Sequence, residues 1–552
     1  MKLHFIGADH EVTGSAHFIK ACGLNMLVDY GMEQGVNVLE NEPLPVPASE
    51  INYVFLTHAH VDHSGMLPYL YALGFRGRVI TTVATADLCS IMLRDCAHIQ
   101  MQEAEWKSRK NKRGGDFGPA EPLYTMEDAD GVIARIDGYD YNEKYNIAEG
   151  VDCRFTDIGH LLGSTSIELW LTENGITKKL VFSGDIGNTD QPLIKDPEYT
   201  KDADVVVMES TYGNRYHERN RLDYVSELTA ILRETFQRGG NVVIPSFAVG
   251  RTQEMLYFIR QIKADRLLEE FQDFEVYVDS PLAVDATEIF KNNIYSCFDE
   301  EAMELVNQGI NPLTFPGLKL TITSEESKEI NFNEKPKVII SASGMCEAGR
   351  IRHHLKHNLW REECTILFVG YQAVGTLGRR IVDYGADRDN DPLVGLDPNR
   401  NTIKLFGEAV EMKAHIKVLA GMSGHADKQG LTDWINAFEK QPERVFIVHG
   451  EDSVAEEFKE YLHNEYGHNS FAPYSGTIYD ILTDDFDYIA EPHYIKETKK
   501  TEGGRKVSEV FARLLAAGNR LLTVINHNEG GTNKDLAKFA DQINSLCDKW
   551  DR

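Results

Sequence analysis

The sequence lacks the features that mark secreted, disulfide-linked and membrane-spanning proteins. Its eight cysteines are scattered and contain no CxxC pair, which fits reduced thiols better than a disulfide framework. No window reaches the roughly 18 consecutive apolar residues that a membrane helix needs. Residues 1–15 also lack the long apolar core of a secretory signal. We therefore expect a cytoplasmic protein with no membrane partner.

Positive charge is scarce as well. Lysine and arginine number 57 against 86 aspartates and glutamates, so the formal net charge is −29. This excess disfavours non-specific attraction to membranes or to polyanions. Any contact with a nucleic acid must therefore be made by a local basic pocket. With 552 residues, 42% of them hydrophobic, the chain is long enough for about two to four domains.

Short apolar runs alternate with longer helical patterns along the chain. Runs such as NYVFLT, KKLVFSGD, ADVVVMEST and RVFIVHG are apolar nearly throughout. Such strands are usually buried on both faces, so helices should cover the sheets and the fold class should be α/β. Several of these runs are followed directly by polar residues, among them Asp185, Glu209 and His449. We expect these strand ends to converge on one site.

The stretch LTHAHVDHSG places His58, His60, Asp62 and His63 directly after an apolar run. Imidazole and carboxylate ligands favour a divalent ion such as zinc. Two histidines one residue apart in an extended turn can face one ion, which leaves the other two side chains for a second ion. The spacing therefore predicts half of a two-metal site. The alternative is a polar loop without metal, which this four-ligand spacing disfavours.

Later strand ends offer the ligands that such a site still needs. The stretch DIGHLLGS supplies His160, VFSGDIGN supplies Asp185 and FIVHGE supplies His449. A carboxylate between two cations can bind each of them with one oxygen. Asp185, in a turn flanked by glycine, is the candidate for this bridging role.

Together HAHVDH, GH and SGDIG resemble the metallo-β-lactamase superfamily of dizinc hydrolases. The stretches MESTYG, GMSGHAD and IVHGE are similar to motifs A, B and C of its β-CASP branch, which includes RNA-processing nucleases such as the endonuclease subunit of the cleavage and polyadenylation specificity factor. IPSFAVGRTQEML, YVDSPLA, ASGMCEAGR, RHHLKHNL and GYQAVGTLGRR also resemble that branch. The resemblance covers about residues 1–482. It implies an αββα sandwich with an inserted α/β domain.

The resemblance implies a role for each matching position. We expect two zinc ions per chain, one held by His58, His60, His160 and Asp185 and the other by Asp62, His63, Asp185 and His449. Asp29 in LVDYG corresponds to a carboxylate that orients a ligand histidine without binding metal. Glu209 matches motif A, and His425 matches motif B.

The expected chemistry is phosphodiester hydrolysis. Two cations beside one water supply hydroxide near neutral pH and neutralise the charge that builds on phosphorus. Asp62 can orient that water. His425 is the candidate general acid for the leaving oxygen, and Glu209 favours its imidazolium form. A histidine at motif C, here His449, resembles the RNA-processing members of the branch.

We therefore predict a zinc-dependent ribonuclease that cuts within single-stranded RNA and leaves a 5′ phosphate. The substrate should lie in a cleft between the two domains. Three alternatives stay open at this point. The chain could be a hydrolase of the same fold that acts on DNA or another phosphodiester or ester, a 5′-to-3′ exoribonuclease, or an inactive RNA-binding scaffold. The complete ligand set argues against the scaffold.

Two further features predict contact with RNA. The glycine-rich turns SASGM and GTLGR can bind phosphate through backbone N–H groups. The candidate residues there are Arg251, Ser343, Gly344, Arg350, Thr376 and Arg379. EAGR departs from the more usual double glycine of the branch. The tract WKSRKNKRGG predicts either a basic lip for RNA or a solvated helix end; its cations are Lys107, Arg109, Lys110, Lys112 and Arg113.

The positions of the motifs predict the domain boundaries. A metallo-β-lactamase domain would occupy residues 1–208 and return at 411–482, around a β-CASP domain at 209–410. Residues 483–552 would form a linker and a helical extension, because apolar residues there recur at helical spacing and the motif of a known RNA-binding module is absent. We expect this extension to pack on the body or to mediate self-association into a homodimer.

Overall fold

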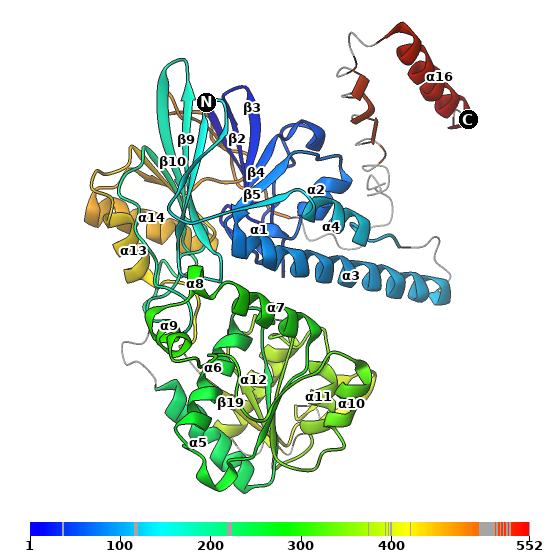
Figure 1. The fold of residues 1–552 in the computed structure, drawn as a ribbon, viewed down its shortest axis with the longest axis vertical. Coiled ribbons are helices and arrows are strands. Elements are labelled where there is room, and N and C mark those ends of the chain that lie inside the picture. Colours follow the sequence, from blue (N-terminus) through cyan, green and yellow to red (C-terminus); the bar gives the residue numbers. More distant parts are fainter. Residues whose placement is uncertain are drawn as a thin grey trace.

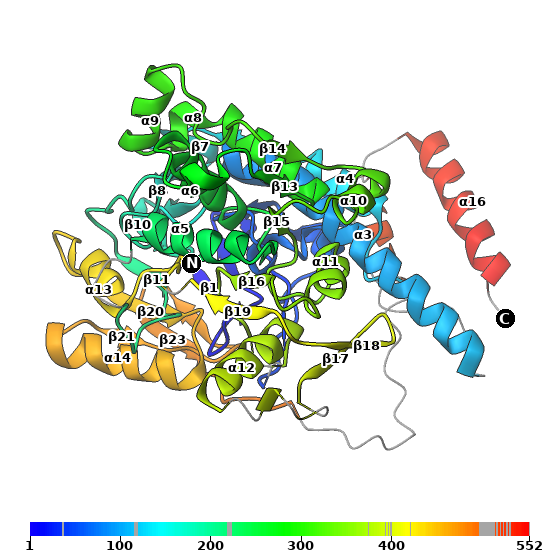
Figure 2. The same cartoon turned by 90° about the horizontal axis from the view of Figure 1, so that it is seen from below.

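The computed structural model describes most of the chain, and three sheets contain most of its strands (Figures 1 and 2). The described residues are 1–35, 38–114, 120–217, 223–373, 375–391, 400–419, 421–495 and 532–550, with a few more between 394 and 397 and between 514 and 528. In Figure 1 the blue, cyan and gold elements form an upper body, and the green elements form a second body below it.

Two sheets packed face to face form the upper body. The first has, in spatial order, β23 (Asp485–Tyr488), β22 (Ile478–Asp480), β1 (Lys2–Gly7), β2 (Ala16–Ala21), β3 (Leu24–Val28), β4 (Tyr53–Phe55), β5 (Arg78–Thr82) and β6 (Ile136–Tyr139). The second has β21 (Ser470–Phe471), β20 (Arg444–Val448), β11 (Val205–Glu209), β10 (Ile176–Phe182), β9 (Thr165–Glu173), β8 (Val151–Asp157) and β7 (Lys144–Ala148).

Helices cover the outer faces of both sheets. Those on the first sheet are α1 (Val61–Ser64), α2 (Leu67–Ala72), α3 (Val83–Gly114) and α4 (Met126–Ile133), and those on the second are α13 (Lys428–Asn436) and α14 (Asp452–Tyr466). The residues of strand β11 (Val205–Glu209) before its final glutamate are apolar because both faces of the strand are buried. Val205 and Val207 pack between the sheets, whereas Val206 and Met208 pack under α13 and α14. The αββα sandwich predicted from the sequence is confirmed.

The second body is a parallel sheet of six strands with helices on both faces. Its strands, in spatial order, are β14 (Leu318–Leu320), β13 (Glu275–Val278), β15 (Lys337–Ser341), β12 (Val242–Pro245), β16 (Thr365–Phe368) and β19 (His415–Val418). The helices are α5 (Tyr224–Gln237), α6 (Arg251–Ala264), α7 (Pro281–Asn292), α8 (Ile294–Cys297), α9 (Glu300–Asn307), α10 (Ser324–Ile330), α11 (Ile351–Asn358) and α12 (Leu377–Asn390).

This second body is inserted between two neighbouring strands of the sandwich. β11 and β20 pair with each other, yet the whole six-stranded sheet lies between them in the chain. The predicted inserted α/β domain is therefore confirmed. Strand β19 lies beyond the predicted boundary at residue 410 and still pairs with β16. We propose that the insertion ends after β19, and the other domain boundaries stay predictions.

Two strands and a helix of the described chain lie outside these three sheets and their covering helices. β17 (Thr402–Leu405) and β18 (Glu408–Glu411) form a separate hairpin, and helix α16 (Asn533–Trp550) stands away from the body in both views (Figures 1 and 2). All eight cysteines are described, and all are free thiols. No helix among the described residues is long and apolar enough to cross a membrane. Self-association through the C-terminal helices stays a prediction.

A buried carboxylate joins two layers of the inserted body. Asp279, directly after β13, accepts hydrogen bonds from His354 Nε2 on α11 (2.6 Å), Thr321 Oγ1 (2.6 Å) and Ser327 Oγ (2.6 Å). Arg350 Nη1 lies 2.8 Å from the same carboxylate. Burial alone would raise the pKa of Asp279, but the hydrogen bonds from His354, Ser327 and Thr321 hold it well below its ordinary value.

Replacing Asp279 with alanine should lower the free energy of unfolding by about 3–5 kcal/mol, because its buried cationic and hydroxyl partners lose their acceptor. The control D383N removes an exposed ion pair with Arg379. It should change the free energy of unfolding by less than about 1 kcal/mol. Urea titration measures both.

The contribution of Asp279 to the free energy of unfolding should also depend on pH. Its folded-state pKa is lowered, so its stabilisation is complete above the unfolded value near about pH 4 and is lost as the pH falls further. The difference between wild type and D279A should therefore shrink in acid. A difference that stays constant from pH 7 to pH 3 would contradict this account.

Candidate metal centre and active site

Parallel strands bring distant residues to one edge of the sandwich. Strands β10, β11 and β20 run parallel as neighbours, so their carboxyl ends meet there. Asp185 follows β10, Glu209 ends β11 and His449 follows β20. In the facing sheet, β3 and β4 are also parallel, which places Asp29 beside Thr57. The predicted convergence of strand ends is therefore seen in the structure.

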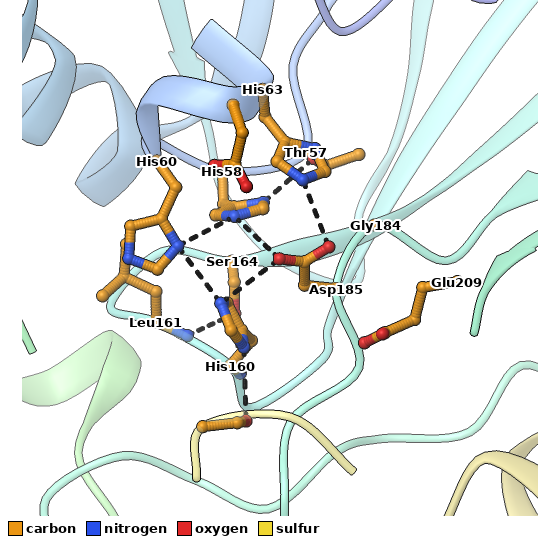
Figure 3. A network of polar contacts seen from close by, with 12 residues as sticks. Thr57, His58, His60, His63, His160, Leu161, Ser164, Gly184, Asp185 and Glu209 are labelled. Carbon is orange, nitrogen blue, oxygen red and sulfur yellow. Dashed lines mark hydrogen bonds and ion pairs between the residues drawn. The ribbon is translucent and has the colours of Figure 1, made fainter. Parts of the chain in front are cut away.

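One group of side chains gathers around one oxygen of Asp185 (Figure 3). His60 Nδ1 lies 3.2 Å from both His58 Nε2 and His160 Nε2. Asp185 Oδ2 lies 3.5 Å from His58 Nε2 and 3.4 Å from His160 Nε2. These four ligand atoms all lie within 4.8 Å of one another.

A second group gathers around the other oxygen of Asp185. His63 Nε2 lies 3.1 Å from Asp185 Oδ1 and 3.2 Å from His449 Nε2. His449 Nε2 lies 3.7 Å from Asp185 Oδ1 and 3.8 Å from Asp62 Oδ2. The carboxylate of Asp185 thus has one oxygen toward each group. Sequence analysis predicted these two sets, and the structure brings each set together.

Hydrogen bonds on the far side of the rings direct lone pairs into the centre. Nδ1–H of His63 donates to Asp29 Oδ2 (2.8 Å), and Nδ1–H of His58 donates to Thr57 Oγ1 (3.1 Å), whose own hydroxyl donates to Asp29 (2.9 Å). His160 Nδ1–H donates in the same way to a backbone carbonyl (3.2 Å). In each of these three rings Nδ1–H is held on the far side, so Nε2 is the nitrogen that faces the centre and can bind a cation.

Three hydrogen-bond partners of the histidines were not predicted from the sequence. His160 is held by the carbonyl of Gly424, and His449 Nδ1–H donates to Thr211 Oγ1 (3.2 Å). A backbone carbonyl leaves no trace in the residue type, so Gly424 offered no signal. Thr57 was also missed, although its position directly before the first histidine of LTHAHVDH was a usable signal.

The donor set fits a divalent metal. Lone pairs of ring nitrogens that meet at 3.2 Å repel one another unless a proton or a metal ion lies between them. Zinc–nitrogen bonds of about 2.0–2.1 Å in a tetrahedron place neighbouring ligand atoms about 3.3–3.4 Å apart. The nearest spacings in the first group are 3.2–3.5 Å. Asp185 Oδ1 is buried and accepts no hydrogen bond from a described residue, which is also expected of a metal ligand.

The electrostatics differ between the two groups. Burial and neighbouring imidazoles lower the pKa of His58 and His160, which keeps both rings neutral. Burial would also lower the pKa of His63 and His449, but Asp185 raises both above the ordinary value. Binding a cation at the second group therefore requires the release of protons from these rings.

The backbone is strained at two of these residues. Asp29 has φ 58° and His449 has φ 50°, in the left-handed region that residues other than glycine seldom adopt. Gly31 lies so close to the metal-site turn that a Cβ on it would stand 1.6 Å from the carbonyl oxygen of Asp62. The fold therefore holds this turn tightly against β3.

His425 lies at the edge of the centre and is held differently from the ligands. Its Nδ1 lies 3.1 Å from Glu209 Oε1 and 3.3 Å from Oε2, and its Nε2 lies 3.9 Å from Asp185 Oδ2. Its side chain is 22% exposed, against 2% for Asp185. Burial would lower the pKa of His425, but Glu209 and Asp185 raise it to about 10. The ring is thus cationic at neutral pH and open to a substrate.

Asp185, Glu209 and His425 also lie close enough to be considered as a metal group. The carboxylate of Glu209 already accepts hydrogen bonds from the N–H groups of Ile186 (2.6 Å) and Thr211 (3.2 Å) as well as from His425. It has no oxygen left for a cation. This arrangement favours a proton-carrying role for His425.

The residues predicted to contact phosphate have internal partners. Arg251 pairs with Glu254 and donates to the carbonyl of Met422. Arg350 pairs with Asp279, as described above. The others are Arg379, which pairs with Asp383 (2.7 Å), Thr376, which caps α12 by accepting from Arg379 N (3.2 Å), and Ser343 and Gly344 after β15. Their contact with phosphate stays a prediction.

The predicted basic lip is partly neutralised. In the projecting half of α3, Lys107 lies 3.4 Å from Glu103, and Arg109 lies 2.7 Å from Glu105. Both pairs are exposed and separated by four residues, as in a solvated helix face. The side chains of Lys110, Lys112 and Arg113 lie outside the described residues.

Three family models match the chain. They are a beta-lactamase superfamily domain over residues 25–237, a Beta-Casp domain over residues 252–381 and a Zn-dependent metallo-hydrolase RNA specificity domain over residues 409–473. The first and third lie mainly on the sandwich, and the second lies on the inserted body.

Curated relatives match over most of the chain. Ribonuclease TTHA0252 of Thermus thermophilus is 35% identical over 82% of this chain and 94% of its own length. Transcription termination factor FttA of Thermococcus kodakarensis is 29% identical over 85% of this chain and 69% of its own length. An RNase J-like protein of Methanocaldococcus jannaschii is 28% identical over 87% of this chain and 99% of its own length.

Replacing Asp29 with asparagine should weaken metal binding about 10- to 100-fold. The amide would turn an N–H group toward His63 or Thr57, and the His63 proton would move to the nitrogen that must face the metal. Metal retained after dialysis against graded chelator measures the effect, with D541N on exposed α16 as the control. Equal retention by wild type and D29N would contradict the orienting role of Asp29.

Proposed function

The chain belongs to the β-CASP branch of the metallo-β-lactamase superfamily, and from that premise we propose that it is a zinc-dependent ribonuclease. It would hydrolyse phosphodiester bonds within single-stranded RNA. The observation that carries the proposal is the position of Asp185, whose two oxygens face two separate groups of ring nitrogens. One carboxylate in this position suits a pair of cations and has no evident structural purpose without them.

Two zinc ions per chain are part of the proposal. His58, His60, His160 and Asp185 would hold one, and Asp62, His63, His449 and Asp185 the other. When bound, such a pair lowers the pKa of a nearby water and neutralises charge on a phosphate. The name of the matched metallo-hydrolase domain and the all-nitrogen-and-oxygen ligand set support zinc.

The protein's own groups would then complete the reaction. The Asp62 carboxylate, which is 22% exposed, orients the attacking water. Oxygen of that water bonds to phosphorus, the bond from phosphorus to the 3′ oxygen breaks, and His425 gives its proton to this leaving oxygen. Glu209 holds the His425 ring in place and favours its protonated form. The products are a 3′ hydroxyl and a 5′ phosphate.

Support for RNA as the substrate comes from three sides. The third matched family model is named for RNA specificity, and the 35% identical relative is a ribonuclease. His449 stands at the motif where RNA-processing members of the branch carry histidine. Action within the strand, a cytoplasmic location and a possible homodimer complete the proposal.

The test compares matched single-stranded RNA and DNA oligonucleotides labelled at the 5′ end. We expect RNA to be cut faster and the first labelled products to be 5′-terminal fragments several nucleotides long. Faster turnover of DNA would overturn the substrate assignment. Release of only labelled mononucleotides would instead identify a 5′-to-3′ exoribonuclease.

Replacing His425 with alanine should slow RNA cleavage by about 10²- to 10⁴-fold, because the leaving oxygen loses its proton donor. Zinc content should stay near two per chain, since His425 is not a ligand in this scheme. The control H493A removes an exposed histidine of the described chain and should change neither quantity. Loss of zinc in H425A, or full activity, would remove the assigned role.

A further inference from the structure

A cavity of about 300 Å³ lies directly behind His425. Its lining includes Gly187 and Ala426, which adjoin the metal-site turns. Gly187 forms a backbone bridge with His425, and His217 Nε2 lies 2.9 Å from the carbonyl oxygen of His425. This volume is at the lower end of the range for small-molecule sites and fits a single nucleoside-sized group. The proposed mechanism leaves the cavity without a role.

Two exposed aromatic rings belong to the lining. Tyr199 is 49% exposed and Tyr216 is 54% exposed, although both stand beside a site rich in buried side chains. They come from different segments of the chain, one before β11 and one after it. Exposed tyrosines beside a nuclease centre are the platforms on which single-stranded nucleic acids stack their bases.

The polar groups of the cavity suit a base and not a phosphate. The lining contains the carboxylates of Asp427 and Asp433 and no lysine or arginine. Asp427 caps α13, and both of its carboxylate oxygens accept hydrogen bonds from backbone N–H groups. Asp433 accepts one hydrogen bond from Gln429 Nε2 (2.8 Å) through Oδ1, and its Oδ2 accepts none from a described residue. An anionic acceptor repels phosphate and attracts amino groups.

Two more groups in or near the cavity are available to a ligand. Asn188 contributes a side-chain amide that makes no hydrogen bond to a described residue. Trp434 also lines the cavity, and its buried Nε1–H has no acceptor among the described residues. A buried indole N–H without a partner is uncommon in folded proteins. Polar atoms of a bound base would meet such groups.

Cations flank the cavity without belonging to it. Arg215 stacks on Tyr212 at 3.9 Å, and Lys428 lies 3.5 Å from the ring of Tyr461. The backbone N–H of Lys428 donates to the carbonyl of Arg215 (2.9 Å), so the two residues are neighbours. Neither forms an ion pair with a described carboxylate. A chain whose base enters the cavity would carry its phosphates past these cations.

We propose that this cavity is a subsite for one base of the RNA, next to the bond that is cut. The inference rests on the proposed ribonuclease function and adds a specificity to it. Asp433 accepts from an exocyclic amino group, as a carboxylate does from cytosine N4. Uracil offers a carbonyl at that position. The subsite therefore prefers cytosine to uracil.

The test measures equilibrium binding of fluorescent oligo(C) and oligo(U) RNA to zinc-loaded full-length protein carrying H425A, which slows cleavage enough for binding to be measured. We expect oligo(C) to bind at least about fivefold more tightly than oligo(U). Adding Asp433→Asn, which presents both a donor and an acceptor in the same shape, should bring the ratio near one. Adding Y216A should weaken both by about 5- to 150-fold, and Y216F should not.

The control Y295A removes a tyrosine of α8 that is 82% exposed and does not line the cavity, and it should leave both affinities unchanged. Equal binding of oligo(C) and oligo(U) to H425A, or a ratio that D433N leaves intact, would overturn the subsite. A protein that shows the expected ratio yet cuts no RNA in its wild-type form would overturn the proposed function alone. Cleavage of RNA with no effect of D433N on binding would overturn the subsite alone.

Discussion

The two oxygens of Asp185 each face a separate cluster of ring nitrogens, and this constraint governs most of the surrounding structure. Ring nitrogens and carboxylate oxygens that meet at 3.1 to 3.5 Å in a buried site need a proton or a metal ion between them. The rings do not turn away, because hydrogen bonds from their far nitrogens to Asp29, Thr57 and a backbone carbonyl hold them. The fold thus assembles in advance an arrangement that suits divalent cations and that protons hold together without them.

The sandwich is the part of the fold that allows this assembly. Parallel neighbours β10, β11 and β20 end at one edge, so residues separated by more than 200 positions meet without any long loop. The chain leaves the sandwich for the insertion at this same edge, after β11, and returns before β20. It separates Glu209 from His425 in the chain while both stay within hydrogen-bonding distance. The insertion therefore begins and ends at the edge of the sandwich that carries the centre.

Sequence analysis predicted the parts of this site that residue types encode. His58, His60, Asp62 and His63 are close together in the chain, and His160, Asp185 and His449 each follow an apolar strand. The ligands and the sheet edge where they meet could therefore be predicted from the sequence. The role of Gly424 could not be predicted, because any residue type offers a backbone carbonyl. Arg251 and Arg350 were assigned to phosphate from their charge, whereas the structure pairs them with Glu254 and Asp279. A sequence shows a charge but not its partner. The proposed end of the insertion after β19 rests on a similar kind of information, since the pairing of β19 with β16 is a long-range contact.

The net charge of −29 makes recognition of RNA a local matter. Around the centre the side chains of Asp29, Asp62, Asp185 and Glu209 are carboxylates, so the site without cations would repel a phosphate. With two divalent ions bound, the four positive charges and the His425 cation outweigh them. Binding of substrate then depends on the same ions as the chemistry does. In the proposed subsite behind His425, the carboxylate of Asp433 would select against phosphate and for a base. On this proposal a strongly acidic protein holds RNA with cations at the phosphate and a carboxylate at the base.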